Sequence, residues 1–166
     1  AQCLVGSEMC IRDRILPYLE KLQESEELAQ QETLRVAVLF SGDTGFYSGC
    51  RKLYVELQEA IAAGQLRGSV RILPGISSVV SLAARVGESY EDAAILSMHG
   101  KKLNRLAATV ESHEKVFLLT SGCEDIRKIG QTLTEAGLGD CEVIAGYQLS
   151  YPEENICLLY TSDAAD

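Results

Sequence analysis

The sequence predicts an α/β protein of two small domains, each built on a mostly parallel sheet. The chain has 166 residues, of which 46% are hydrophobic and 23% charged, so it is long enough to bury a core without disulfides. Short apolar runs alternate with helical patterns along the chain, and this alternation is typical of right-handed βαβ units. Several of the apolar runs end in loops of glycine and small polar residues, which is where α/β proteins bind ligands.

The individual elements follow from local composition. Arg35–Phe40 is apolar without alternation, as expected for a strand buried on both faces, and further strands are predicted over residues 69–73, 93–97, 115–120 and 141–147. Apolar residues at helical spacing among good helix formers predict helices over residues 15–30, 46–63, 79–86, 101–112 and 126–136. Glycines at positions 64, 87 and 137 follow three of these helices and are suited to end them.

Composition excludes several classes of protein. The formal net charge is −9, which argues against a nucleic-acid partner, because such binding needs a basic footprint. Mean hydropathy is +0.04 and no apolar run approaches the ~18 residues of a membrane span, so no membrane association is expected. The six cysteines form no CxxC pair, and we expect no metal site. Reduced thiols and the lack of a secretory pattern predict a cytoplasmic protein.

The two ends differ from the middle of the chain. Gly6–Arg14 (GSEMCIRDR) and Cys157–Asp166 (CLLYTSDAAD) resemble translated sequencing-adapter tags, so residues 1–14 and 157–166 are expected to be non-native tails with few contacts to the core. Without them the net charge is −7, since they hold two basic and four acidic residues. The alternative is a genuine amphipathic start and a genuine final strand. The β propensity of LLYT favours strand pairing in either case.

Three loops at predicted strand ends are candidate binding elements. They are Ser41–Ser48 (SGDTGFYS), Pro74–Ser78 (PGISS) and Thr120–Gly122 (TSG). Glycines allow the backbone to approach a ligand, and Asp43 or Thr44 is suited to cap the helix that follows. None of the loops has the Walker A or the GxGxxG pattern. From the residues alone, the prediction is therefore a small-molecule crevice, and the alternative is that each loop is a plain turn and cap.

The order and spacing of SGDTGFYS, PGISS and SMHG, with VFLLTSG and GYQLSYPEE further on, resemble the tetrapyrrole methylase superfamily. The resemblance covers about residues 15–156 and is strongest to the branch that methylates C5 of corrin-ring precursors (precorrin or cobalt-precorrin) in cobalamin biosynthesis. Thr44 stands where the family usually has proline. The family opens with a strand and a GxGPG loop that this chain lacks, so we expect a chain truncated at both ends, without part of the cofactor site.

The resemblance implies two α/β domains with S-adenosylmethionine held between them, here residues 15–93 and residues 94–156, both incomplete. The activity that it implies is methyl transfer from the sulfonium to a ring carbon of an anionic tetrapyrrole. It also implies either a homodimer or a fusion to, or partnership with, a C15-methyltransferase/decarboxylase. The family's cofactor contacts map to Gly42, Asp43, Phe46, Ile76, Ser77, Ser78, His99, Leu119 and Thr120.

An acidic protein needs a local cationic patch to hold an acidic substrate. The densest candidate is Lys101, Lys102 and Arg105, which a helix over residues 101–112 would place on one face. Arg51 and Lys52 are a second option and Arg85 a third, and the alternative is that all of these are ordinary surface charges.

No catalytic acid or base stands out in the sequence, which agrees with methyl transfer, because that reaction depends mainly on alignment and exclusion of water. Two other functions stay open. One is another branch of the same superfamily, such as a uroporphyrinogen, diphthine or ribosomal-RNA methylase. The other is a non-catalytic nucleotide-binding α/β module.

Overall fold

The computed structural model describes residues 2–4, 8–25, 34–98 and 105–165, and side chains from residue 14 onward. By its backbone contacts the chain divides into two compact units, Ala1–Ser77 and Ser78–Asp166, each with its own apolar cluster. The sequence instead predicts a domain boundary between residues 93 and 94, and that boundary remains a prediction. None of the described helices is both long and apolar enough to cross a membrane.

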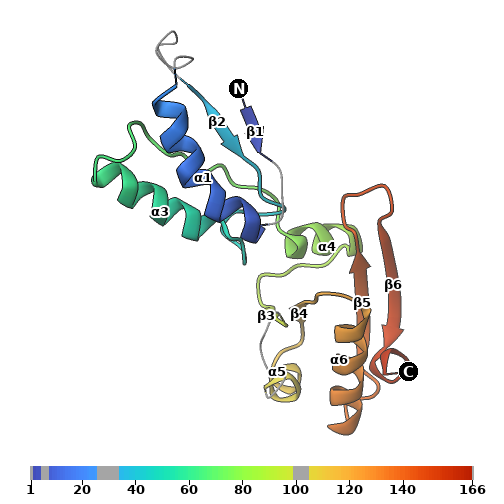
Figure 1. The fold of residues 1–166 in the computed structure, drawn as a ribbon. Coiled ribbons are helices and arrows are strands. Elements are labelled where there is room, and N and C mark those ends of the chain that lie inside the picture. The colour runs from blue at the N-terminus through green and yellow to red at the C-terminus, as the bar shows by residue number, and fades with distance from the viewer. Residues whose placement is uncertain (1, 5–7, 26–33, 99–104, 166) are drawn as a thin grey trace. The chain divides into compact units, whose positions relative to one another are not determined.

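The first unit pairs two short strands with two helices (Figure 1). Its elements are β1 (Gln2–Leu4), α1 (Glu8–Gln23), β2 (Val36–Val38) and α3 (Cys50–Ala62). The strands are parallel, with Gln2 opposite Val36 and Leu4 opposite Val38. Helix α1 begins earlier than predicted, inside the segment expected to be a tail, and its described part ends before the predicted residue 30.

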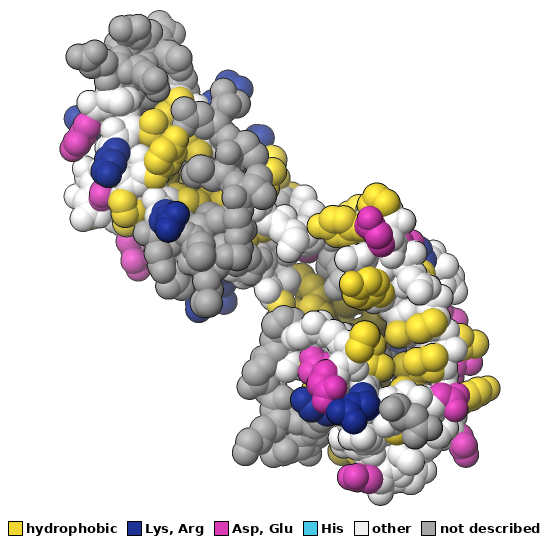
Figure 2. All heavy atoms as spheres, turned by 45° about the vertical axis from the view of Figure 1, so that its right-hand side comes forward, with side chains coloured by type: hydrophobic (Ala, Val, Ile, Leu, Met, Phe, Trp, Pro, Cys, Tyr) yellow, Lys and Arg dark blue, Asp and Glu magenta, His cyan; other side chains and the backbone are white. Residues whose placement is uncertain are grey.

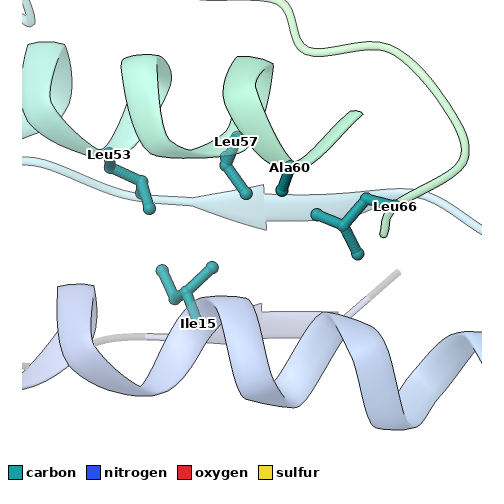
Figure 3. Packing of buried hydrophobic residues seen from close by; sticks show 5 residues of the cluster. All are labelled: Ile15, Leu53, Leu57, Ala60 and Leu66. Atoms are coloured by element: carbon teal, nitrogen blue, oxygen red, sulfur yellow. The ribbon is translucent and has the colours of Figure 1, made fainter. Parts of the chain in front are cut away.

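The core of the first unit lies between α1 and α3 (Figure 3). Leu53, Leu57 and Ala60 recur at helical spacing on one face of α3, and each is at most 7% exposed. Ile15 points at them from α1 and is 1% exposed. Leu66 closes the cluster after the chain turns back, where its backbone N–H donates to the carbonyl of Ala60. This packing holds α3 in place, and α3 follows the first candidate binding loop, Ser41–Ser48.

The second unit contains the remaining elements (Figure 1). They are α4 (Ser78–Val86), β3 (Ala94–Ser97), α5 (Leu106–Ser112), β4 (Val116–Leu119), α6 (Cys123–Glu135), β5 (Glu142–Tyr147), β6 (Asn155–Tyr160) and α7 (Thr161–Ala164). Strands β3 and β4 are parallel, with Ala94 opposite Val116 and Ser97 opposite Leu119. Strands β5 and β6 form an antiparallel hairpin. The predicted α/β class is confirmed, and the described strands form two parallel pairs and one antiparallel pair.

Two predicted elements differ from the structure. The strand predicted over Ser69–Leu73 does not form, because none of the described strands pairs with this segment, and Leu73 is 62% exposed. A strand without a neighbour leaves its backbone groups unpaired. The helix predicted from Phe46 starts instead at Cys50, since Tyr47 has a positive φ of 50° and the Ser48 hydroxyl accepts a hydrogen bond from the Cys50 N–H.

The C-terminal residues pack against the second unit, contrary to the expectation of few contacts. Strand β6 pairs with β5 along its whole length, from Asn155 to Tyr160. Thr161 is fully buried, and its hydroxyl donates to the carbonyl of Leu138. A Cβ atom at Gly130 of α6 would lie 2.7 Å from the carbonyl carbon of Ala164. The native or non-native origin of this segment remains a prediction, but the fold uses it.

Gly130→Ala tests this docking. In the full chain we expect a loss of about 1–3 kcal/mol in unfolding free energy, because the new methyl group collides with the backbone of α7. In a chain that ends at Tyr160, the same substitution should stabilise by up to about 1 kcal/mol, because alanine favours a helix over glycine. Urea unfolding of all four proteins measures both differences. Stabilisation in the full chain would contradict the docking of the C-terminal residues.

Candidate functional site

Two of the predicted binding loops touch each other through their main chains. We call residues 41–48 the GD loop and residues 73–77, which include all of the predicted loop Pro74–Ser78 except its last residue, the PG loop. A Cβ atom at Gly75 would lie 2.1 Å from the carbonyl oxygen of Gly42, far inside van der Waals contact. Gly42 itself has a φ of +70°, a conformation that favours glycine. The close contact therefore requires glycine at position 75, and the left-handed turn favours it at position 42.

Hydrogen bonds shape the GD loop from within. The carboxylate of Asp43 accepts a hydrogen bond from the N–H of Gly45 at 2.6 Å, and the carbonyl of Asp43 accepts one from the N–H of Phe46 at 3.2 Å. The rings of Phe46 and Tyr47 meet edge to face with centroids 5.0 Å apart. Asp43 thus closes the turn of the loop, whereas the sequence predicted a cap for a helix that in fact starts later, at Cys50.

Thr44 links the two loops. Its hydroxyl donates to the carbonyl oxygen of Leu73 in the PG loop at 3.2 Å. Proline, which the family resemblance predicts at this position, has no hydroxyl to donate. The departure from the family pattern therefore adds a contact that holds the GD loop against the PG loop.

The residues of these loops differ in their access to a ligand. Gly42 is exposed, and Ile76 has 69% of its surface exposed. Asp43 and Phe46 are half-buried. Ser77 is only 6% exposed. Of the predicted cofactor contacts in the first unit, Gly42 and Ile76 are thus the two that are fully accessible.

The remaining predicted cofactor contacts lie in the second unit. Ser78 is the exposed first residue of α4, and the half-buried Leu119 and Thr120 lie where β4 ends. The carbonyl of Leu119 accepts a hydrogen bond from the Met98 N–H at 2.8 Å, which aligns the ends of β3 and β4. His99 lies outside the described residues.

The third predicted loop, Thr120–Gly122, is closed by an acidic residue of the helix behind it. The Asp125 carboxylate accepts a hydrogen bond from the Ser121 N–H at 2.7 Å. Here the plain structural alternative, a turn and cap, accounts for the observed contacts.

The predicted cationic patch is only partly described. Lys101 and Lys102 lie outside the described residues. Arg105 is exposed and directly precedes α5, with a non-helical φ of −122°, and a common helix face with Lys101 and Lys102 remains a prediction. Arg51 and Lys52 are exposed in the first turn of α3. Arg85 is committed to an ion pair with Glu154 and is not a free cation for substrate carboxylates.

The described residues contain no cluster of three His, Cys, Asp or Glu side chains suited to a metal ion. His113 is exposed and directly follows α5, and its Nδ1 lies 3.0 Å from the carbonyl oxygen of Thr109 in the last turn of that helix. Burial raises the pKa of the Cys50 thiol, which keeps it protonated and unreactive at neutral pH.

Comparison with known proteins identifies curated relatives. The chain is 30% identical over 149 residues to a probable cobalt-precorrin-7 C(5)-methyltransferase of Methanocaldococcus jannaschii, covering 86% of this chain and 66% of the relative. It is also 30% identical over 123 residues to a precorrin-6Y C(5,15)-methyltransferase (decarboxylating) of Sinorhizobium, covering 74% of this chain and 28% of the relative. The chain thus spans at most about two thirds of the length of these relatives.

A solved structure shares the fold. The methyltransferase CobJ superposes with a TM-score of 0.61 at 20% sequence identity, covering 87% of this chain and 64% of that one. The family model of tetrapyrrole (corrin/porphyrin) methylases matches residues 14–163. The match starts where the predicted N-terminal tail ends and includes most of the packed C-terminal segment. With the two touching glycine loops and a match over most of its length, the chain belongs to the tetrapyrrole methylase family.

Proposed function

We propose that this protein takes part in the S-adenosylmethionine-dependent methylation of a corrin-ring precursor, a precorrin or cobalt-precorrin, at C5 in cobalamin biosynthesis. The names of two relatives and membership of the family support this activity. The observation that carries it is the main-chain contact between Gly42 and Gly75, which brings the two predicted binding loops together. A cytoplasmic location and a partner or fused C15-methyltransferase/decarboxylase belong to the same proposal, with a homodimer as the alternative.

The residues of the first unit fit S-adenosylmethionine in chemical kind. Glycine backbone at residues 42 and 75 lets a ligand approach main-chain N–H and C=O groups, and exposed Ile76 offers apolar surface to an adenine ring. When bound, this cofactor supplies an electrophilic methyl group on a sulfonium. In the proposal it is held by Gly42, Asp43, Phe46, Ile76, Ser77, Ser78, His99, Leu119 and Thr120.

The chain's part in the reaction is to orient the reactants. Transfer of a methyl group to a carbon nucleophile needs in-line alignment and a dry site, and it gains most from groups that do not move. The bonds of Asp43 and Thr44 to the backbone restrict the GD loop in this way. No side chain is assigned as acid or base.

A non-catalytic nucleotide-binding module would use the same loops. Methyl transfer from labelled S-adenosylmethionine to a corrin precursor separates the two functions, because the module would bind the cofactor without turnover. Another branch of the family would turn over a different methyl acceptor.

Gly75→Ala should reduce S-adenosylmethionine affinity at least tenfold. The new Cβ atom would collide with the Gly42 carbonyl and force the two loops apart. Gly139→Ala is the matched control, since its Cβ atom would meet only a Thr134 methyl group at an ordinary 3.8 Å. Calorimetric titration measures affinity, and thermal unfolding reports the integrity of the fold. Equal affinity in both variants would mean that the loops are turns with no role in binding.

Thr44→Val should weaken cofactor binding about fivefold. The variant loses the hydrogen bond from the Thr44 hydroxyl to the Leu73 carbonyl, and the net cost of losing such a bond is about 1 kcal/mol. Thr44→Ser keeps the hydroxyl and should bind like the parent protein. If serine and valine have the same effect, the bond to Leu73 does not matter for the site.

The cationic residues are proposed to hold substrate carboxylates. Replacing Lys101, Lys102 and Arg105 by Ala should weaken binding of cobyrinic acid, a stable corrinoid with free carboxylates, about tenfold at low salt. It should also flatten the salt dependence and leave cofactor affinity unchanged. The control is Arg127→Ala with Lys128→Ala, which removes exposed charges of α6. Similar losses in both variants would mean that overall charge, not this patch, governs binding.

A further inference from the structure

The connection between β5 and β6, residues 148–154, holds a backbone that is unfavourable by itself. Gln148 has a φ of 47° and Ser150 a φ of 72°, and neither is glycine. Among the described residues, one other non-glycine residue has a positive φ, Tyr47 in the GD loop. Such conformations persist only where surrounding contacts hold them, and they concentrate at functional sites. We call residues 148–154 the hairpin loop.

One arginine contacts the hairpin loop at two residues, Ser150 and Glu154. The Arg85 guanidinium on α4 forms an ion pair with the Glu154 carboxylate through Nε, and its Nη2 lies 3.5 Å from the Ser150 hydroxyl. The same carboxylate accepts a hydrogen bond from the Ser150 N–H. Arg85 also donates to the carbonyl of Ser81 at 3.3 Å, which orients the guanidinium from its own helix.

This arrangement is stronger than an ordinary surface pair. The side chains of Arg85 and Glu154 are only 34% and 26% exposed, and the carboxylate accepts charge-assisted bonds from two donors. The hydrogen bond from Arg85, with that from the Ser150 N–H, lowers the pKa of Glu154 below its usual value. The Glu154 carboxylate is therefore charged at neutral pH, and both of its contacts with the hairpin loop and Arg85 are present at that pH.

Apolar packing of a loop leucine against α4 and β5 also holds the hairpin loop in place. A Cβ atom at Gly146 of β5 would lie 3.0 Å from a methyl carbon of Leu149 and 2.9 Å from one of Leu82. Both leucines thus pack directly against Gly146, in the space that a side chain there would occupy. The Tyr151 N–H donates to the carbonyl of Gln148 at 3.0 Å and closes the turn.

The anchored loop presents aromatic side chains to solvent. Tyr151 is 63% exposed and Tyr147, at the end of β5, is 59% exposed. Figure 2 shows hydrophobic side chains, with an acidic one beside them, on the end of the second unit that carries this loop in Figure 1. Tyrosines that face solvent on a restrained loop do not contribute to burial of the protein's own apolar surface. Their arrangement is explained by contact with a ligand, because a loop that is already ordered loses little conformational entropy on binding.

We propose that the hairpin loop is a preformed contact surface for the ring face of the tetrapyrrole, with Tyr151 as the contact residue and Arg85 and Glu154 as positioning residues. This inference rests on the proposed function. The charge of the hairpin loop determines which part of the substrate can bind to it. Glu153 is exposed and Glu154 is neutralised by Arg85, so the loop repels substrate carboxylates and favours the uncharged face of the macrocycle.

The first experiment compares tyrosine variants of the full chain, with cobyrinic acid as the probe and its absorbance change as the signal. Tyr151→Ala should weaken corrinoid binding at least tenfold, whereas Tyr151→Phe keeps the ring and should change it less than twofold. Tyr90→Ala is the control, because Tyr90 is another exposed tyrosine of the same unit that lies outside the loop, at 41% exposure. S-adenosylmethionine affinity should be unchanged in all three variants.

The second experiment tests positioning. Glu154→Ala should weaken corrinoid binding about as much as Tyr151→Ala, and the double variant should be no weaker than either, since Glu154 acts only through the placement of Tyr151. Additive losses would overturn the positioning role. Corrinoid binding unaffected by Tyr151→Ala, or absent from the parent protein, would overturn the contact surface. Failure of the parent protein to bind S-adenosylmethionine would instead contradict the proposed function.

Discussion

The close approach of the Gly42 carbonyl to the backbone of Gly75 is the constraint on which the candidate site of the first unit depends. Main chains approach this closely only where no Cβ atom intervenes, and the position of one loop then dictates the position of the other. The bond from Thr44 to Leu73 acts on the same pair of loops from the side. Behind them, the packing of Ile15 against Leu53 and Leu57 fixes the start of α3 and hence the end of the GD loop.

The second unit uses side chains where the first uses glycine backbone. Its hairpin loop is held in an unfavourable conformation by an arginine and a glutamate from distant parts of the sequence. A glycine at Gln148 or Ser150 would adopt the same φ without strain, but it would also leave the loop free to adopt other conformations. The ion pair and the leucines above Gly146 supply the restraint that the backbone itself does not.

The sequence predicts the local elements and the family well, and long-range pairing poorly. The helix over residues 79–86 and the strands over residues 93–97 and 115–120 are confirmed within one or two residues, because strong apolar patterns and flanking glycines define them. The strand over Ser69–Leu73 is wrong, since strand formation depends on a partner that local composition does not reveal. The PGISS motif made Gly75 part of a predicted binding loop. The contacts of Arg85 with Glu154 and of Thr44 with Leu73 join residues far apart in the sequence, and no local pattern predicts them.

Strand β6 has a consequence for the behaviour of the protein at high concentration. It pairs with β5 along one side, and none of the described strands pairs with its other side. Its sequence, NICLLY, has no charge and no proline, and Leu158 is 62% exposed. Natural edge strands usually resist self-association through lysine, proline or a bulge, and β6 has neither of these residues. Intermolecular β-pairing, and with it aggregation, is therefore expected to begin at this strand.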